Sequence, residues 1–184
     1  MASRLRISGG SARGLPIVEP RGVRLRPTSG LVREAIFNII AERVPEARVL
    51  DLFAGTGALG IESLSRGAAS ATFVEGEAAC CQAIAQTLNR AGLESRARVL
   101  RGRMPAALAS LEGPYDLILM DPPYNLDEAT TGIAEVARLL AGGGMVVFEH
   151  ASRYNPPEHP RGLHLTDRRV YGDTAIALYT GEED

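Results

Sequence analysis

The sequence predicts an α/β protein whose core is a mostly parallel β-sheet, and three observations indicate this fold. The length of 184 residues suits one domain with a core that needs no disulfide or metal. Short, nearly wholly apolar runs alternate with segments of helical periodicity, which is typical of a parallel sheet covered on both faces. Near the carboxyl terminus two strand-like runs are joined by Gly172-Asp173, which indicates an antiparallel hairpin that closes one edge of the sheet.

The first 45 residues are expected to form an extension ahead of this alternating part. Apolar residues interrupted by glycines predict a short β-hairpin and arm, with the apolar positions Leu5, Ile7, Leu15 and Ile17. Ser29 suits the N-cap of a helix, and apolar residues recur at helical spacing until Pro45, at Val32, Ile36, Ile39 and Ile40. We therefore divide the chain into residues 1–45 and residues 46–184.

The alternating part continues from residue 46 to the closing hairpin. Strands are expected at Val49–Leu52, Ala71–Val74, Arg98–Leu100, Leu117–Met120 and Met145–Glu149. Helices are expected after Gly57, from about Glu77 to Ala91, from Pro105 to Leu111 and from about Asp127 to Leu140. The closing hairpin is expected to pair Leu163–Tyr171 with Thr174–Tyr179.

Positive charge is concentrated at the N-terminal end. Residues 1–33 hold seven arginines and one glutamate, so this segment carries +6 while the rest of the chain carries −8. Local charge of this kind suits an anionic partner such as a nucleic-acid backbone. A solvated, arginine-rich hairpin explains the composition equally well, so charge alone leaves both interpretations open.

Composition argues against a membrane protein, a disulfide and a metal site. No apolar run reaches the roughly 20 residues of a membrane span, and the first residues lack the apolar stretch of a signal peptide. We therefore expect a soluble, cytoplasmic protein. Separately, we expect a monomer. Cys80 and Cys81 are adjacent in an expected helix, so we expect reduced thiols. The histidines follow no metal-ligand spacing, and we expect no metal at His150, His159 and His164.

A glycine-rich loop follows the first expected strand and indicates a cofactor site. The run Asp51–Gly60 contains Gly-x-Gly-x-x-Gly between a strand and a helix. Gly55 and Gly57 let the backbone turn tightly and approach a ligand, and the helix N-terminus favours negative charge. Glu75, at the end of the second strand, is placed to accept hydrogen bonds from ribose hydroxyls. Both a dinucleotide and S-adenosylmethionine satisfy these features.

Asp51 distinguishes between the two cofactors. This residue lies at the carboxyl end of the first strand and is expected to point its carboxylate into the crevice, where it would repel a pyrophosphate. The same carboxylate suits the ammonium or sulfonium side of S-adenosylmethionine. The alternative is that Asp51 only forms the turn.

A second motif, Asp121-Pro122-Pro123-Tyr124, follows the fourth expected strand. Two prolines stiffen this loop, while the Asp121 side chain and the Pro122 carbonyl offer hydrogen-bond acceptors. A planar amine suits the site, because both its N–H groups find acceptors and its ring stacks on Tyr124, which aligns a weak nucleophile for attack. Since the first and fourth strands should be neighbours, the two motifs should meet. Alone, the loop would be interpreted as a rigid turn, and whether Asp121 takes the proton stays open.

These motifs resemble those of the class I amino-methyltransferases. Other segments are similar to one subgroup, the RsmD-like 16S ribosomal RNA guanine-N2 methyltransferases, through Arg6-Ile7-Ser8-Gly9-Gly10, Arg13-Gly14, Arg26-Pro27-Thr28, Val32-Arg33-Glu34, Phe37-Asn38 and Tyr171-Gly172-Asp173-Thr174. The resemblance spans nearly the whole chain and implies a Rossmann-like, seven-stranded sheet whose last strand is antiparallel. It also implies S-adenosylmethionine as cofactor, and as target the guanine conventionally numbered 966 in 16S rRNA or the assembling small ribosomal subunit.

The motifs and the resemblance together assign expected roles to individual residues. Catalytic roles are expected for Asp121, Pro122 and Tyr124. Cofactor contacts are expected from Asp51, Phe53, Ala54, Gly55, Gly57, Glu75 and Thr28. The N-terminal hairpin is expected to hold RNA through Arg6, Arg13 and Arg26. Many class I enzymes carry an acid after the third strand, near the adenine, whereas here backbone contacts are expected from Arg103 and Met104.

Other functions account for part of the sequence. A DNA amino-methyltransferase shares the Asp-Pro-Pro-Tyr loop, but it usually adds a target-recognition segment, for which only the first 45 residues are left. In a protein-glutamine methyltransferase the loop typically begins with Asn, where this chain has Asp121. An NAD-dependent dehydrogenase or a non-catalytic RNA-binding module leaves the residues from Asp121 to Tyr124 without a purpose. No Gly-x-Ser-x-Gly elbow is present to support a hydrolase of that kind.

Overall fold

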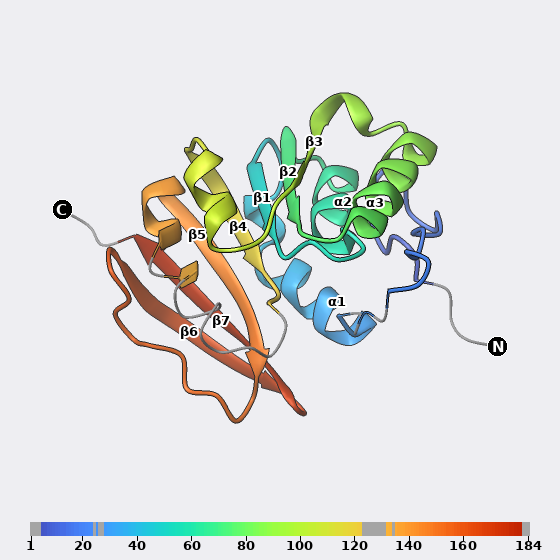
Figure 1. Ribbon diagram of the computed structural model, residues 1–184. Helices are drawn as coiled ribbons and strands as arrows, with labels where there is room; N and C mark the ends of the chain where they lie inside the picture. Colours follow the sequence, from blue (N-terminus) through green and yellow to red (C-terminus); the bar gives the residue numbers. More distant parts are fainter. Residues whose placement is uncertain (1–4, 24, 26–27, 123–131, 134, 182–184) are drawn as a thin grey trace.

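The fold is taken from a computed structural model, which describes residues 5–23, 25, 28–122, 132–133 and 135–181 (Figure 1). These residues form a seven-stranded sheet in the order β3-β2-β1-β4-β5-β7-β6. Its strands are β1 Arg48–Leu52, β2 Ser70–Glu75, β3 Ala97–Arg101, β4 Tyr115–Met120, β5 Leu140–Ala151, β6 Leu163–Tyr171 and β7 Thr174–Gly181. β1 pairs in parallel with both β2 and β4, whereas β7 is antiparallel to both of its neighbours. The predicted parallel sheet with an antiparallel last strand is confirmed, as is the pairing of the first and fourth strands.

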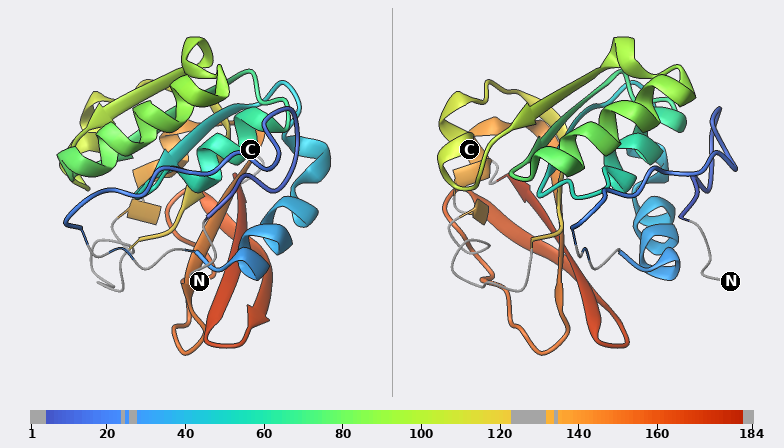
Figure 2. Two further views of the ribbon diagram at one scale, coloured as in Figure 1. Left: turned by 90° about the vertical axis from the view of Figure 1, so that its right-hand side faces the viewer. Right: turned by 45° about the vertical axis from the view of Figure 1, so that its right-hand side comes forward.

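Three helices, α1 Gly30–Ile39, α2 Ala58–Ser65 and α3 Ala78–Ala91, lie together on one side of the sheet within the described ranges (Figure 2). Alternate side chains of the strands point to opposite faces, so each face builds its own apolar cluster. The cluster under the helices includes Ile36, Ile61 and Ile84. The opposite cluster is covered by short 3₁₀ turns at Ala106–Ser110 and Ala137–Leu139. No described helix has the length and apolar character that crossing a bilayer requires.

Several element boundaries differ from the sequence prediction. The lead-in helix α1 ends at Ile39 instead of reaching Pro45, and a 3₁₀ turn at Ala41–Arg43 follows it. The stretch expected as a helix from Pro105 to Leu111 is the 3₁₀ turn Ala106–Ser110. Apolar spacing over so few residues does not distinguish the two helix types.

The helix expected from about Asp127 to Leu140 falls partly outside the described residues, which resume at 132–133 and 135–136 in helical conformation. Its predicted end is wrong. Leu140 already belongs to β5 and pairs with Tyr115, so the strand begins five residues before the expected Met145. Three consecutive glycines, residues 142–144, hide this extension because they carry no side chains to alternate.

The N-terminal hairpin is packed into the domain. Its antiparallel pairing is confirmed but short, with one bridge between Arg6 and Pro16 and a hydrogen bond of 3.0 Å from the Ile7 N–H to the Leu15 carbonyl. Its turn closes the carboxyl end of α2, where the Ser11 N–H donates to the Ser65 carbonyl at 2.8 Å. A Cβ at Gly10 would lie 1.8 Å from that carbonyl oxygen, so the close approach requires glycine.

Candidate functional site

A cavity of about 590 Å³ runs along the carboxyl ends of the parallel strands. The loops after β1, β2, β3 and β4 line it, together with the end of β5, the first residue of β7 and the segment ahead of α1. In an open α/β sheet this edge is where ligands bind, at the point where the strand order reverses. That reversal occurs here between β1 and β4.

Most of the predicted site residues meet in this cavity. Its lining includes Thr28, Asp51, Phe53, Ala54, Gly55, Glu75, Arg103, Met104, Asp121 and Pro122. The N-terminal arm is the segment of residues 5–23, which includes the hairpin. Arg6 and Arg13 are exposed on this arm and are not part of the lining. Tyr124 and Arg26 lie outside the described residues.

Asp51 lines the cavity as predicted, although its carboxylate also organises the start of α2. The side chain is 2% exposed, and its Oδ2 accepts a hydrogen bond of 2.9 Å from the Gly60 N–H in the first turn of α2. The N-cap residue Gly57 has no side chain with which to satisfy the first amides of the helix. Asp51 supplies that acceptor from the neighbouring strand, where negative charge also complements the helix dipole.

The pKa of Asp51 is raised well above its usual value. Burial is the largest cause, because the ionised carboxylate loses water. The Gly60 N–H opposes this effect, while the negative charges of Asp121 and Glu75 add to it. An ionised Asp51 is therefore costly in this cavity unless a cation accompanies it.

Glu75 holds two loops at once. Its Oε2 accepts a hydrogen bond of 2.7 Å from the Gly55 N–H, and its Oε1 accepts one of 2.8 Å from the Glu77 N–H. Each carboxylate oxygen has two lone pairs, so these bonds leave acceptor capacity for ribose hydroxyls. The carboxylate thus fixes the glycine-rich loop and faces the same cavity.

The three glycines of the glycine-rich loop after β1 are needed for different reasons. Gly55 lies in the cavity lining with a φ of 56°, a left-handed conformation that favours glycine. Gly57 does not line the cavity, contrary to the expected ligand contact, and a Cβ there would lie 2.8 Å from Ile84 Cγ1. At Gly60 a Cβ would lie 2.3 Å from Phe73 Cε1. The second and third glycines therefore allow close packing of α2 on α3 and on β2.

Asp121 is bonded to the segment ahead of α1. Its Oδ2 accepts a hydrogen bond of 2.6 Å from the Thr28 hydroxyl, across 93 positions of sequence. Both residues line the cavity, and Pro122 follows Asp121 there. The predicted meeting of the two motifs is confirmed, since Asp121 also acts electrostatically on Asp51.

The end of β5 contributes cavity residues that the sequence did not suggest. Glu149 and His150 line the cavity beside Thr174 of β7. His150 is 7% exposed, its Nδ1 lies 2.8 Å from the Ala151 carbonyl, and its Nε2 is buried without a hydrogen-bonding partner among the described residues. A carbonyl only accepts, so Nδ1 carries the proton and Nε2 is an acceptor. Burial lowers the pKa of His150, which keeps the ring neutral.

A usable signal for these residues was present. The expected strand Met145–Glu149 ends at the same edge of a parallel sheet as the other strands, so polar residues at its end are candidates for the cavity lining.

Arg103 covers one rim of the cavity. Its Nη2 lies 3.1 Å from Glu77 Oε1, in a pair with 81% and 52% of the two side chains exposed. An exposed pair of this kind contributes little to stability. Its stem crosses Gly76, where a Cβ would lie 2.9 Å from Arg103 Cγ. Met104 is buried in the apolar cluster beside it.

The charge of the cavity lining decides which cofactor fits. Of the described residues that line it, five are acids and one is an arginine, the acids being Asp51, Glu75, Glu77, Asp121 and Glu149. A dinucleotide pyrophosphate would meet repulsion here, whereas a cofactor with ammonium and sulfonium groups would meet compensating charge. The residues present therefore fit S-adenosylmethionine.

The chain is similar over most of its length to one protein family and to bacterial proteins named as methyltransferases. The family model described as conserved hypothetical protein 95 matches residues 5–180. The ribosomal RNA small subunit methyltransferase D of Escherichia coli (strain K12) is 36% identical over 98% of this chain and 92% of its own length. A candidate rRNA methyltransferase of Bacillus subtilis, YlbH, is 34% identical over 95% of this chain and 98% of its own.

A solved structure shows the same likeness in three dimensions. The Escherichia coli protein yhhF, described as a candidate methyltransferase, superposes with a TM-score of 0.86 at 32% identity, covering 98% of this chain and 99% of its own. Together with the strand order, this likeness confirms the predicted Rossmann-like class I methyltransferase fold.

Proposed function

The chain belongs to the family described as conserved hypothetical protein 95, and from this premise we propose that it is an S-adenosylmethionine-dependent methyltransferase acting on ribosomal RNA. One observation carries the proposal. Two acids at the carboxyl ends of β1 and β2, Asp51 and Glu75, line a cavity. Asp121 and Pro122, which follow β4, line the same cavity. A cationic cofactor and an amine acceptor can thus be held side by side.

The residues of this chain divide the work of binding and orientation. When bound, S-adenosylmethionine supplies an electrophilic methyl group on its sulfonium. Asp51 offers a buried negative charge to the cationic side of the cofactor, and Glu75 offers acceptors to its ribose. Phe53, Ala54 and Gly55 line the cavity and would form the loop along which the cofactor is held. Arg103 and Met104 line the cavity after β3, where they would contact the adenine.

Asp121 and the Pro122 carbonyl would orient the target amine, with Tyr124 as the stacking partner of its ring. An exocyclic amine donates two N–H groups and is a weak nucleophile, so the alignment of its lone pair supplies much of the rate enhancement. Methyl transfer would form one N–C bond, break the S–C bond of the cofactor and release one proton from the amine to Asp121 or to water. The E. coli relative is named for the small ribosomal subunit, which supports 16S rRNA as the target. Within 16S rRNA we propose N2 of guanine 966, as the resemblance of the sequence motifs implies.

The N-terminal extension would hold the RNA. Arg6 and Arg13 are exposed on it, and residues 1–33 carry a charge of +6, although Arg33 is buried beside Glu62. The exposed arginines suit contacts with phosphates. We therefore assign residues 1–45, including Arg26, to RNA binding and residues 46–184 to the methyltransferase domain. The substrate would be the 16S rRNA or the assembling small subunit.

The decisive experiment incubates the protein with isotopically labelled S-adenosylmethionine and 16S rRNA, naked and in small subunits, and locates the methylated nucleotide by mass spectrometry. Wild type should place one methyl group on a guanine amine. Asp121→Ala should lower the rate by at least about 100-fold, because a misaligned amine rarely reaches the attacking geometry. Its affinity for S-adenosylmethionine should stay close to that of wild type.

The same assay contains its own controls. Arg90→Ala alters an exposed arginine in the last turn of α3 that does not line the cavity, and it should leave the rate unchanged. Methyl transfer to DNA or to a protein glutamine, with none to rRNA, would contradict the proposed substrate. A fully active Asp121→Ala enzyme would contradict the proposed mechanism.

A further inference from the structure

We propose that Thr28 is a positioning residue for Asp121, held in place by α1 and, through α1, by the N-terminal arm. The inference rests on the proposed function, because it concerns how Asp121 is oriented for the target amine. It changes the role of Thr28 from the expected cofactor contact to a contact with the catalytic loop.

The contact between the two residues is short and charge-assisted. Thr28 Oγ1 donates to Asp121 Oδ2 at 2.6 Å, a length typical of a hydroxyl bonded to a carboxylate. Both residues line the cavity. The bond restricts rotation of the Asp121 carboxylate about its bond to the rest of the side chain. The chain segment ahead of α1 therefore sets the direction in which the carboxylate can accept a hydrogen bond from an amine.

The start of α1 fixes the place of Thr28. Ser29 is the N-cap of α1, with extended dihedral angles, and its side chain accepts a hydrogen bond of 3.1 Å from the Val32 N–H. Capping ties this residue to the first turn of the helix. The buried face of α1, with Val32 and Ile36, joins the apolar cluster under the sheet. Thr28 therefore precedes a helix that cannot shift without disturbing the core.

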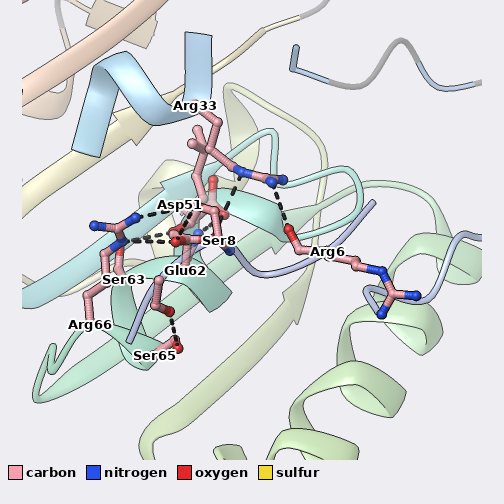
Figure 3. A network of polar contacts seen from close by, with 11 residues as sticks. Arg6, Ser8, Arg33, Asp51, Glu62, Ser63, Ser65 and Arg66 are labelled. Atoms are coloured by element: carbon pink, nitrogen blue, oxygen red, sulfur yellow. Dashed lines mark hydrogen bonds and ion pairs between the residues drawn. The ribbon is translucent and has the colours of Figure 1, made fainter. Parts of the chain in front are cut away.

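A buried polar network locks α1 to α2 and to the arm (Figure 3). From α1, Arg33 Nη2 donates to the Arg6 carbonyl at 2.7 Å, and its Nε lies 4.0 Å from Glu62 Oε2 on α2. Glu62 also accepts bonds of 2.8 Å from the Ser8 N–H, the Ser8 hydroxyl and Arg66 Nε. The helix that receives the Asp51 bond is thus joined to the helix that presents Thr28.

Three segments that are distant in sequence therefore share one arrangement. The arm is fastened to Glu62, α1 is fastened to the arm through Arg33, and Thr28 is fastened to Asp121. Loss of the Thr28 hydroxyl should remove one restraint on the orientation of Asp121 without removing an RNA or cofactor contact. The effect should appear in kcat and spare both KM for rRNA and the dissociation constant of S-adenosylmethionine.

The test compares Thr28→Val, which keeps the shape and removes the hydroxyl, with Thr28→Ser, which keeps the hydroxyl. The matched control is Thr166→Val on β6, whose hydroxyl donates to the Leu178 carbonyl at 3.1 Å outside the cavity. Methyl transfer to 16S rRNA gives kcat and KM, and calorimetry gives the affinity for S-adenosylmethionine. Thr28→Val should lower kcat by about 10-fold, equivalent to about 1.4 kcal/mol, the scale of one hydrogen bond.

Thr28→Ser should recover most of kcat, and Thr166→Val should match wild type throughout. A Thr28→Val enzyme with wild-type kcat would overturn the inference, and so would a serine variant as slow as the valine variant. Weakened S-adenosylmethionine binding with unchanged kcat would make Thr28 a cofactor contact and also overturn it. A wild-type enzyme that methylates no rRNA would overturn the proposed function together with this inference, so the two failures are distinguishable.

Discussion

One buried carboxylate lies within helix α2 and another lies beside its start, and the charges near the two carboxylates are of opposite sign. Glu62, within the helix, is fully buried and meets the protein's own cations, with Arg66 Nε at 2.8 Å and Arg33 Nε at 4.0 Å. Asp51, on β1 beside the helix start, is 2% exposed and accepts one backbone N–H. The charges that act on it come from Asp121 and Glu75, which are also negative.

The difference separates a charge used for structure from a charge reserved for a ligand. A buried acid with cationic partners is stabilised within the folded chain, and removing it leaves those cations unpaired. A buried acid among other acids costs the folded protein stability when it ionises, and a bound cation offsets that cost. The charge of Glu62 therefore serves to hold the N-terminal arm on α2, whereas the charge of Asp51 serves ligand binding in the cavity.

The largest effect should come from Glu62→Gln. The substitution keeps the shape and the acceptor for the Ser8 N–H but leaves Arg33 and Arg66 without a counter-charge. Breaking a buried pair of this kind costs about 3 to 5 kcal/mol of unfolding free energy, measured by urea denaturation. Asp167→Asn, which removes an exposed partner of Arg169 at 2.8 Å, is the matched control and should cost far less.

A Glu62→Gln protein as stable as the Asp167→Asn protein would contradict the structural role of this network. Its affinity for S-adenosylmethionine, measured on the folded fraction, should remain that of wild type because Glu62 does not line the cavity.

Asp51→Asn should have a smaller effect on stability, and one that depends on pH. Because the folded pKa of Asp51 is raised, its contribution to stability is complete below the ordinary value of 3.8 and is lost as pH rises through the folded pKa. The asparagine variant has no such loss and can still accept the Gly60 N–H. Its stability relative to wild type should therefore increase with pH.

Urea unfolding of both proteins from about pH 4 to about pH 8 checks the sign. Curves of stability against pH that run parallel would show that Asp51 titrates alike in the folded and unfolded chains.

The fold followed closely from the sequence because apolar runs and glycine positions report sheet burial directly. The strands β1 to β4 and the β6–β7 hairpin lie within two residues of their expected bounds. The errors fall where side chains carry no such signal, as in the glycines at the start of β5 and the short 3₁₀ turn at Ala106–Ser110. Packing of the arm on α2 depends on contacts such as Ser8 with Glu62, which no local pattern contains.

Residues of the cavity lining could be predicted where a recognisable motif lies at the carboxyl end of a strand. Asp51, Glu75 and Asp121 were found in this way, because the ends of parallel strands share one edge. The role of Gly57 was predictable in part: its left-handed φ of 74° agrees with the expected tight turn, whereas the close approach of Ile84 from another helix is contained in no local pattern. His150 lies near the end of β5, so the same rule points to it as a cavity residue, whereas its burial and its neutral ring depend on the fold and not on a motif.

Calorimetric titration of S-adenosylmethionine into wild type and Asp51→Asn at neutral pH tests the central claim most directly. If Asp51 is the charge reserved for the cofactor, the variant should remain folded and bind more weakly by about 1.5 to 3 kcal/mol, the scale of a hydrogen bond to a charged group. Equal affinities in two folded proteins would contradict the account, because Asp51 would then serve only the first turn of α2.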